Sequence, residues 1–368
     1  MPDTPLHQLS GAGQSVWVDY LSRAFIQDGE LQELVDRGVD GVTSNPTIFQ
    51  SAIAEGDRYD DQLREILKTE TDPKEVFLAV AIDDIRAACD VLRLVWDSGN
   101  GKDGWVSLEV DPNLAHDTDK TKSEAIRLHD LVERPNLFIK IPATVEGLKA
   151  IEDTIAAGVP VNVTLIFSLE RHRKVMEAYV RGVQRFVDGG GDPSGKLASV
   201  GSFFVSRVDT EADKRLDALG GHDELKGKLA IANAKLAYRN YQEIFSTPQW
   251  QALEAKGATK QRCLWASTGV KNPDYKDTLY VEELVGPETV NTMPRELVEA
   301  VNDHGEIRGD TLCEDVDEAS RILDEFEAAG VSYDDVVAVL EKEGVEKFAK
   351  SFADLIEGLE SKVKLVAA

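Results

Sequence analysis

Residues 136–167 read NLFIKIPATVEGLKAIEDTIAAGVPVNVTLIF. This stretch opens and closes with apolar runs, at 136–141 and 159–167, that are rich in the β-branched and aromatic residues favoured in strands. Between the two runs, 145–156 repeats apolar residues three and four positions apart, which is typical of an amphipathic helix. A strand, a helix and a strand in this order predict a βαβ unit with parallel strands.

The same alternation extends in both directions along the chain. Further strands are predicted at 15–20, 41–45, 104–110, 198–206, 261–267 and 288–293, and helices at 117–133, 168–187, 222–245 and 276–285. Eight strands with helical connections indicate a parallel sheet, either a closed barrel or an open doubly wound sheet. The number of strands favours an α/β fold of the (β/α)8 TIM barrel type with extra helices, and no GxGxxG turn or P-loop supports the open sheet.

The last part of the chain, 295–368, reads as a series of acidic helices. They are predicted at 295–302, 315–329, 334–343 and 345–359. We expect these helices to form a C-terminal helical extension packed on a barrel core of about 15–294, so that residues 1–368 make a single domain.

Composition limits the partners. The 67 acidic and 41 basic residues give a net charge of −26, which repels nucleic acid and anionic membranes. A phosphorylated substrate would therefore need a local cluster of cations. The first residues lack the features of a signal peptide, and no apolar run approaches the roughly 18 residues that a membrane helix requires. We expect a soluble, cytoplasmic protein that binds neither nucleic acid nor membranes.

Polar side chains occur near the ends of five consecutive predicted strands, whereas strands of a parallel barrel are normally apolar on both faces. These residues are Asp19, Asn45, Glu109, Lys140, Asn162 and Thr164, and Thr43 shares the face of Asn45 on its strand. Side chains alternate along a strand, and this parity separates the polar set from the aliphatic residues. If the polar face is the barrel interior, the set converges at the mouth where barrel enzymes keep their active sites. One such residue is usually a satisfied core group, but burying the whole set without a function would be costly.

Lys140 is the most informative member of this set. Desolvation inside a barrel favours the neutral amine, which attacks a carbonyl carbon to form an imine. An imine weakens the neighbouring C–C bond, because the nitrogen accepts the electron pair. Glu109, Asp19 and Thr164 are candidate proton carriers for this chemistry, and Asn45 and Asn162 can hold sugar hydroxyls without titrating.

Cations and hydroxyls follow the later strands, where barrels often bind phosphate. Ser202 in the sixth strand and Arg207 just after it are candidates, and Lys271 is a second candidate cation after the seventh strand. An alternative for Arg207 is an ordinary ion pair with Asp209 or Asp213.

Four segments of the chain resemble the transaldolase family. They are GVTSNPTIF at 41–49, LFIKIPAT at 137–144 and VNVTLIFS at 161–168, with TVNTMP at 289–294. The motifs occur in order over about 15–294, and the length is similar to that of the larger bacterial branch. The resemblance implies a transferase that moves a dihydroxyacetone unit from sedoheptulose 7-phosphate to glyceraldehyde 3-phosphate in the pentose phosphate pathway. It implies no cofactor, no metal, and a monomer or homodimer.

The resemblance also implies roles for individual residues. Lys140 matches the Schiff-base lysine, Glu109 and Thr164 the pair that handles the catalytic water, and Asp19 the acid/base at the C4 hydroxyl. Asn45 and Asn162 match the hydroxyl binders, and Thr43, on the strand of Asn45, is a further candidate for substrate binding. Ser202 and Arg207 match the phosphate binders, Ser267 fits the same site, and Phe204 matches a ring that shapes the pocket. The second phosphate-binding arginine common after strand seven is absent here, and Lys271 is its possible substitute.

Three other functions are weighed against this one. A fructose 6-phosphate aldolase on the same barrel would carry Tyr in place of Glu109. A metal-dependent aldolase is disfavoured because the histidines are scattered, and His172, flanked by charged residues, is predicted to be a solvated surface group. The three cysteines, Cys89, Cys263 and Cys313, likewise form neither a zinc nor a disulfide pattern. A barrel without catalysis, acting as a scaffold, would not need the polar set.

Overall fold

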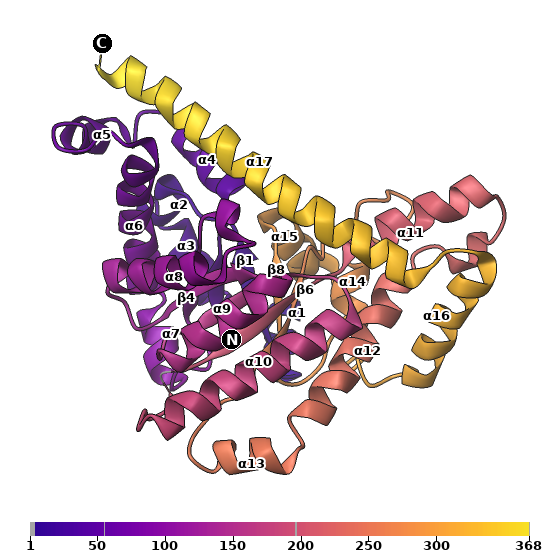
Figure 1. Cartoon of the computed structure of the whole chain (residues 1–368). Coiled ribbons are helices and arrows are strands. Elements are labelled where there is room, and N and C mark those ends of the chain that lie inside the picture. Colours follow the sequence, from indigo (N-terminus) through magenta and orange to yellow (C-terminus); the bar gives the residue numbers. More distant parts are fainter. Residues whose placement is uncertain (1–3, 55, 196, 368) are drawn as a thin grey trace.

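The computed structural model describes residues 4–54, 56–195 and 197–367 and contains a closed barrel of eight parallel strands (Figure 1). The strands are β1 (Gln14–Asp19), β2 (Gly41–Thr43), β3 (Trp105–Glu109), β4 (Leu137–Pro142), β5 (Val161–Ile166), β6 (Ser199–Phe204), β7 (Arg262–Ala266) and β8 (Thr289–Met293). Each pairs with the next in chain order, and β8 pairs with β1. The predicted (β/α)8 barrel is confirmed.

Helices surround the barrel and form its connections. They are α1 (Pro5–Gly11), α2 (Arg23–Gln27), α3 (Glu30–Asp36), α4 (Pro46–Ala54), α5 (Asp60–Ile66), α6 (Pro73–Val91), α7 (Arg93–Ser98), α8 (Thr118–Val132), α9 (Val145–Ala156), α10 (Leu169–Asp188), α11 (Ser206–Leu219), α12 (Leu229–Ile244), α13 (Pro248–Glu254), α14 (Leu279–Glu283), α15 (Arg295–His304), α16 (Val316–Ala329) and α17 (Tyr333–Ala367), with short 3₁₀ turns at Pro112–Leu114 and Asp223–Leu225. No helix within the described ranges is long and apolar enough to cross a membrane.

Large aromatic side chains fill the lower barrel interior. The rings of Trp105 and Phe138 stack 4.1 Å apart, and Trp17 lies 6.1 Å from Phe138. Because β1 and β4 are not neighbours in the sheet, this last contact crosses the interior. It therefore identifies the inward faces of β1 and β4. Asp19 and Lys140 lie two residues further along these strands, on the same inward faces. A side chain at Gly41 would meet the Trp17 indole at 2.6 Å, so only glycine lets this ring pack.

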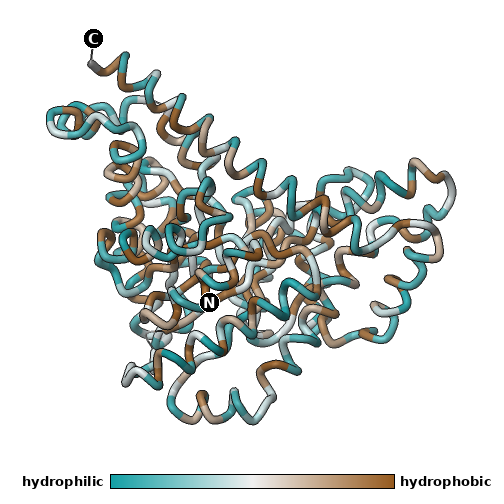
Figure 2. The backbone as a smooth tube through the Cα atoms, viewed as in Figure 1, coloured by the Kyte–Doolittle hydropathy of each residue, from teal (hydrophilic) through white to brown (hydrophobic). Residues whose placement is uncertain are grey.

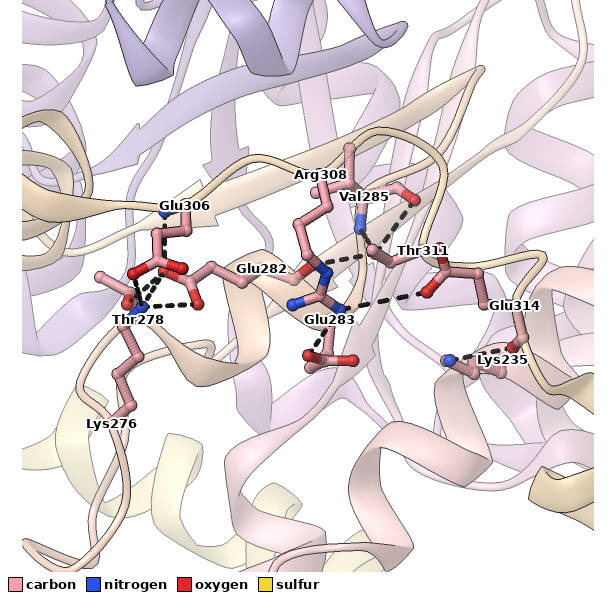
Figure 3. A network of polar contacts seen from close by, with 10 residues as sticks. All are labelled: Lys235, Lys276, Thr278, Glu282, Glu283, Val285, Glu306, Arg308, Thr311 and Glu314. Atoms are coloured by element: carbon pink, nitrogen blue, oxygen red, sulfur yellow. Dashed lines mark hydrogen bonds and ion pairs between the residues drawn. The ribbon is translucent and has the colours of Figure 1, made fainter.

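A polar network, drawn in Figure 3, connects the C-terminal extension to α14, the helix between β7 and β8. The buried Glu282 of α14 accepts hydrogen bonds from Thr278 Oγ1 (2.8 Å) and from the backbone N–H of Glu306 (2.9 Å). Thr311 Oγ1 donates to the carbonyl of Glu282 (2.9 Å), and Arg308 pairs with Glu283 at 2.9 Å. These bonds fix the 305–314 connection and thereby set where the final helices begin.

The extension ends in one long helix, α17, which corrects the prediction of two helices at 334–343 and 345–359. Gly344 does not break it, because a glycine inside a helix costs only about 1 kcal/mol and here lets the backbone approach the barrel. A Cβ at Gly344 would lie 3.2 Å from Leu165 Cδ2 and 3.3 Å from Phe167 Cε2, at the end of β5. Hydrophobic and hydrophilic residues alternate along the helix (Figure 2), which runs past α4 and α11 (Figure 1).

Two smaller predictions also need correction. The helix expected at 222–245 begins only at Leu229, after a 3₁₀ turn and Gly227 with a positive φ of 73°. His172 is not a solvated surface group: it is 1% exposed and its ring packs 5.4 Å from that of Phe203. The helical periodicity of α10 places His172 on the same face as Val175 and Met176, and this outweighs its charged neighbours. Burial lowers the pKa of His172 to about 4.

Candidate active site

A cavity of about 320 Å³ opens at the C-terminal ends of the strands. Ten of the twelve predicted site residues line it: Asp19, Thr43, Asn45, Lys140, Thr164, Ser202, Phe204, Arg207, Ser267 and Lys271. We call it the mouth cavity. The strand ends meet here because the barrel is parallel, so residues from distant parts of the sequence share one volume.

Lys140 lies at the inner end of the mouth cavity, on β4, with a side chain only 7% exposed. Its Nζ is 3.4 Å from Glu109 Oε2 and donates a hydrogen bond to the carbonyl of Ser44 at 3.3 Å. The strand register pairs Lys140 with Glu109 on one side and Asn162 on the other, which brings the three side chains together. The ring of Phe348, from α17, lies 5.3 Å from the same nitrogen. The amine thus faces a cavity with a carboxyl beside it.

Glu109 does not line the mouth cavity. It lines an adjoining cavity of about 20 Å³, roughly the size of one water molecule, whose walls include Phe49, Phe77 and Phe352. These apolar neighbours remove water from the carboxyl, and burial raises the pKa of Glu109 to about 7, although Lys140 opposes the shift. At neutral pH both forms of the carboxyl are populated, which suits a group that must give and take a proton.

Asp19 is oriented by its neighbours on β2 and β8. Thr43 Oγ1 donates a hydrogen bond of 2.7 Å to Asp19 Oδ1 and lies 2.7 Å from Thr292 Oγ1. Thr43 is the register partner of Asp19, so the contact follows from strand pairing. The second carboxylate oxygen of Asp19 makes no hydrogen bond to another described residue, which leaves it able to accept a proton from a substrate hydroxyl.

The two predicted residues of β5 have different surroundings. Asn162 is fully buried below the mouth cavity: its amide donates to Ser107 Oγ (3.0 Å) and its carbonyl accepts from Ser202 Oγ (2.7 Å). Thr164 lines the mouth cavity, and its buried hydroxyl makes no hydrogen bond to another described residue. Thr164 is therefore free to bind substrate or water, whereas Asn162 positions Ser202.

Asn45 lies just beyond β2, at the start of α4. Its Oδ1 accepts a hydrogen bond from the N–H of Ile48 at 3.2 Å, which caps the first helical turn and fixes the side chain at the cavity wall. The amide nitrogen of Asn45 keeps its donors for a ligand.

Two predicted cations, Arg207 and Lys271, line the mouth cavity. Arg207, in the first turn of α11, places its guanidinium 5.1 Å from the ring of Phe204 and forms no ion pair with a described residue. The alternative pairing with Asp209 or Asp213 is wrong, because both carboxylates are used elsewhere. Lys271 is exposed and likewise forms no ion pair with a described residue. Burial lowers the pKa of Arg207 without neutralising it.

Hydrogen bonds connect the segment after β7, which carries Lys271, to α11. Tyr280 OH donates to Asp209 Oδ2 at 2.8 Å, and Tyr275 OH donates to Asp213 Oδ2 at 2.6 Å. At the start of the loop, Ser267 Oγ lies 3.0 Å from Ser206 Oγ, the first residue of α11. These bonds hold the loop after β7 beside Arg207, so the two cations face the same space.

The helix α17 also contributes to the mouth cavity, which was not predicted from the sequence. Lys347, Phe348 and Ser351 of this helix line the mouth cavity across from the strand ends. Their spacing on one helical face and the glycine at position 344 were the available signals, but neither shows which surface the face will cover. The six histidines are absent from the mouth-cavity lining, and no group of three or more potential metal ligands occurs in the part of the chain that the structure describes.

A buried lysine beside a carboxyl, open to a cavity that further cations line, defines a barrel enzyme that attacks carbonyl compounds through an amine. The comparisons agree with this class. The family model described as "Transaldolase/Fructose-6-phosphate aldolase" matches residues 16–359, and the chain belongs to this family.

Relatives cover nearly the whole chain. The protein named "Transaldolase" from Mycolicibacterium paratuberculosis is 56% identical over 356 residues, 96% of this chain and 95% of that protein. "Transaldolase" from Acidothermus cellulolyticus is 56% identical over 353 residues, 95% of each chain. "Transaldolase 2" from Streptomyces coelicolor is 53% identical over 366 residues, 98% of each chain.

Proposed function

We propose that this chain is a transaldolase, which transfers a dihydroxyacetone unit from sedoheptulose 7-phosphate to glyceraldehyde 3-phosphate and yields erythrose 4-phosphate and fructose 6-phosphate. The observation that carries the proposal is the Lys140 amine at the inner end of the mouth cavity, 3.4 Å from the Glu109 carboxyl. The names of relatives that cover the chain almost completely support the same reaction.

The first half of the reaction forms the imine. The amine of Lys140 adds to the ketone carbon of the donor, and Glu109 gives a proton to the carbinolamine hydroxyl, which leaves as water. Asp19 then takes the proton from the C4 hydroxyl. The C3–C4 bond breaks, its electron pair moves to the iminium nitrogen, and the aldehyde leaves.

The second half reverses these steps with a new aldehyde. The enamine on Lys140 attacks the carbonyl carbon of the acceptor, and Asp19 returns its proton to the new alkoxide. Water then hydrolyses the imine, with Glu109 as the base and Thr164 as a hydrogen-bonding partner of the water. Asn45 and Thr43 are the proposed partners of sugar hydroxyls. Asn162 is hydrogen-bonded to Ser107 and Ser202 and supports this side of the cavity from below.

A coupled assay distinguishes transfer from simple cleavage. With fructose 6-phosphate as donor, we expect consumption to depend on added erythrose 4-phosphate and to give sedoheptulose 7-phosphate. Free dihydroxyacetone should form at less than about one hundredth of that rate, because the enamine on Lys140 turns over productively only when an acceptor aldehyde is bound beside it. Release of dihydroxyacetone at the same rate without acceptor would instead identify an aldolase. Loss of activity in EDTA, restored by a divalent metal, would contradict the amine mechanism.

Arg207→Ala tests the phosphate side of the mouth cavity. We expect KM for glyceraldehyde 3-phosphate to rise about 10- to 100-fold, because a charge-assisted bond to phosphate contributes roughly 1.5–3 kcal/mol. KM for unphosphorylated glyceraldehyde should change less than about twofold, because that acceptor presents no anion. Both constants come from initial rates with a saturating donor.

A matched control is Arg215→Ala on the same helix, where the arginine pairs with Glu211 and Asp335 away from the cavity. Equal losses for the two acceptors in Arg207→Ala would assign Arg207 a structural role.

A further inference from the structure

Lys347 joins Arg207 and Lys271 in lining the mouth cavity, and the three cations come from three separate elements: α17, α11 and the loop after β7. None of the three forms an ion pair with a described residue. This is unusual in a chain of net charge −26, where most other lysines and arginines of the surface have carboxylate partners. Three unpaired cations around one cavity are typical of an anion-binding site.

The backbone of α17 fixes Lys347 at this place. One helical turn earlier, Gly344 lies against Leu165 and Phe167, and the adjacent Phe348 lies 5.3 Å from Lys140 Nζ. These contacts leave little freedom for the helix to rotate or slide. Lys347 therefore projects over the cavity from a rigid element and not from a mobile loop.

The charges around Lys347 also indicate an anion. Repulsion by Arg207, then burial, then repulsion by Lys271 lower the pKa of Lys347. A dianionic group among the three would relieve this repulsion. The carboxylate of Glu343, also on α17, attracts Arg207 and opposes the lowering of its pKa, but the two groups form no ion pair.

We propose that Lys347 of the C-terminal helix is a phosphate-binding residue of this enzyme, and that it completes a three-cation site with Arg207 and Lys271. The proposal rests on the proposed function for the identity of the anion, a sugar phosphate. It makes α17 part of the substrate site and so a determinant of specificity for phosphorylated over neutral aldehydes.

The test uses the full chain and two measurements. In Lys347→Gln, we expect the Kd for inorganic phosphate, measured by titration calorimetry, to rise about 5- to 10-fold, as for loss of one partly exposed charge contact. KM for glyceraldehyde 3-phosphate should rise by the same factor, and KM for glyceraldehyde by less than twofold. Glu343→Gln should shift the phosphate Kd in the opposite direction, because it removes a negative charge near Arg207.

Lys342→Gln is the matched control, because this lysine lies on the outer side of α17 with its side chain 77% exposed, and we expect its phosphate Kd to stay within twofold of wild type. A Lys347→Gln protein that binds phosphate as wild type does, while Arg207→Ala does not, would overturn the proposal. Calorimetry needs no turnover, so this outcome is independent of whether the three-carbon transfer itself is observed.

Discussion

Lys140→Met is expected to lower kcat by at least about 10⁴-fold, the scale seen when an enzyme loses its covalent nucleophile. Methionine keeps the length of the side chain and its packing near Phe348 but cannot form an imine. The loss should appear in kcat and in kcat/KM alike, because the amine acts in every step after substrate binding. The measurement is steady-state transfer from fructose 6-phosphate to erythrose 4-phosphate, with circular dichroism to confirm that the variant folds.

Borohydride reduction gives the positive counterpart of this experiment. Wild-type enzyme with fructose 6-phosphate should acquire a stable adduct on Lys140, found by peptide mass mapping, and Lys140→Met should acquire none. Lys149→Met is the matched control: this lysine belongs to α9 of the same βαβ unit, its side chain is 55% exposed, and it pairs with Asp153. An active, folded enzyme without an adduct on Lys140 would refute the Schiff-base mechanism.

Glu109→Gln is expected to lower kcat by about 10²- to 10³-fold, as for loss of a general acid/base. The amide fills the same volume beside Lys140 but carries no proton to exchange with water. The imine should still form slowly and then accumulate, because its hydrolysis loses the base. Borohydride should therefore trap Lys140 in this variant even though turnover is slow.

The pH dependence of kcat tests whether the carboxylate form of Glu109 acts as the base. Burial raises the pKa of Glu109 from 4.5 to about 7, so the carboxylate needed as base is lost as pH falls through 7. Wild-type kcat should then fall up to about tenfold per pH unit below pH 7 if hydrolysis limits the rate. The Glu109→Gln profile should be flat over the same range. Glu109→Asp, which keeps the charge but shortens the reach, should retain the slope at a lower rate. A wild-type slope that persists in Glu109→Gln would assign the titration to another group.

The barrel and most residues that line the mouth cavity could be predicted from the sequence. Alternation of apolar runs with amphipathic segments is a local property, and parallel strands place their carboxyl ends at one edge of a barrel wherever the helices lie. Strand parity then put Asp19, Lys140 and Thr164 on the polar faces of their strands. Strand order indicates which strands are neighbours, but the register that pairs Lys140 with Glu109 and Asn162 is a property of the folded barrel.

The surfaces that the apolar helix faces cover could not be predicted from the sequence. Periodicity shows that α17 and α10 each have an apolar side, but not that the first lies on the mouth cavity or that the second buries His172. The raised pKa of Glu109 has the same origin, because Phe49, Phe77 and Phe352 come from distant segments. Desolvation and like-charge repulsion depend on distances in space, so the electrostatics of Glu109 and Lys347 required the folded chain.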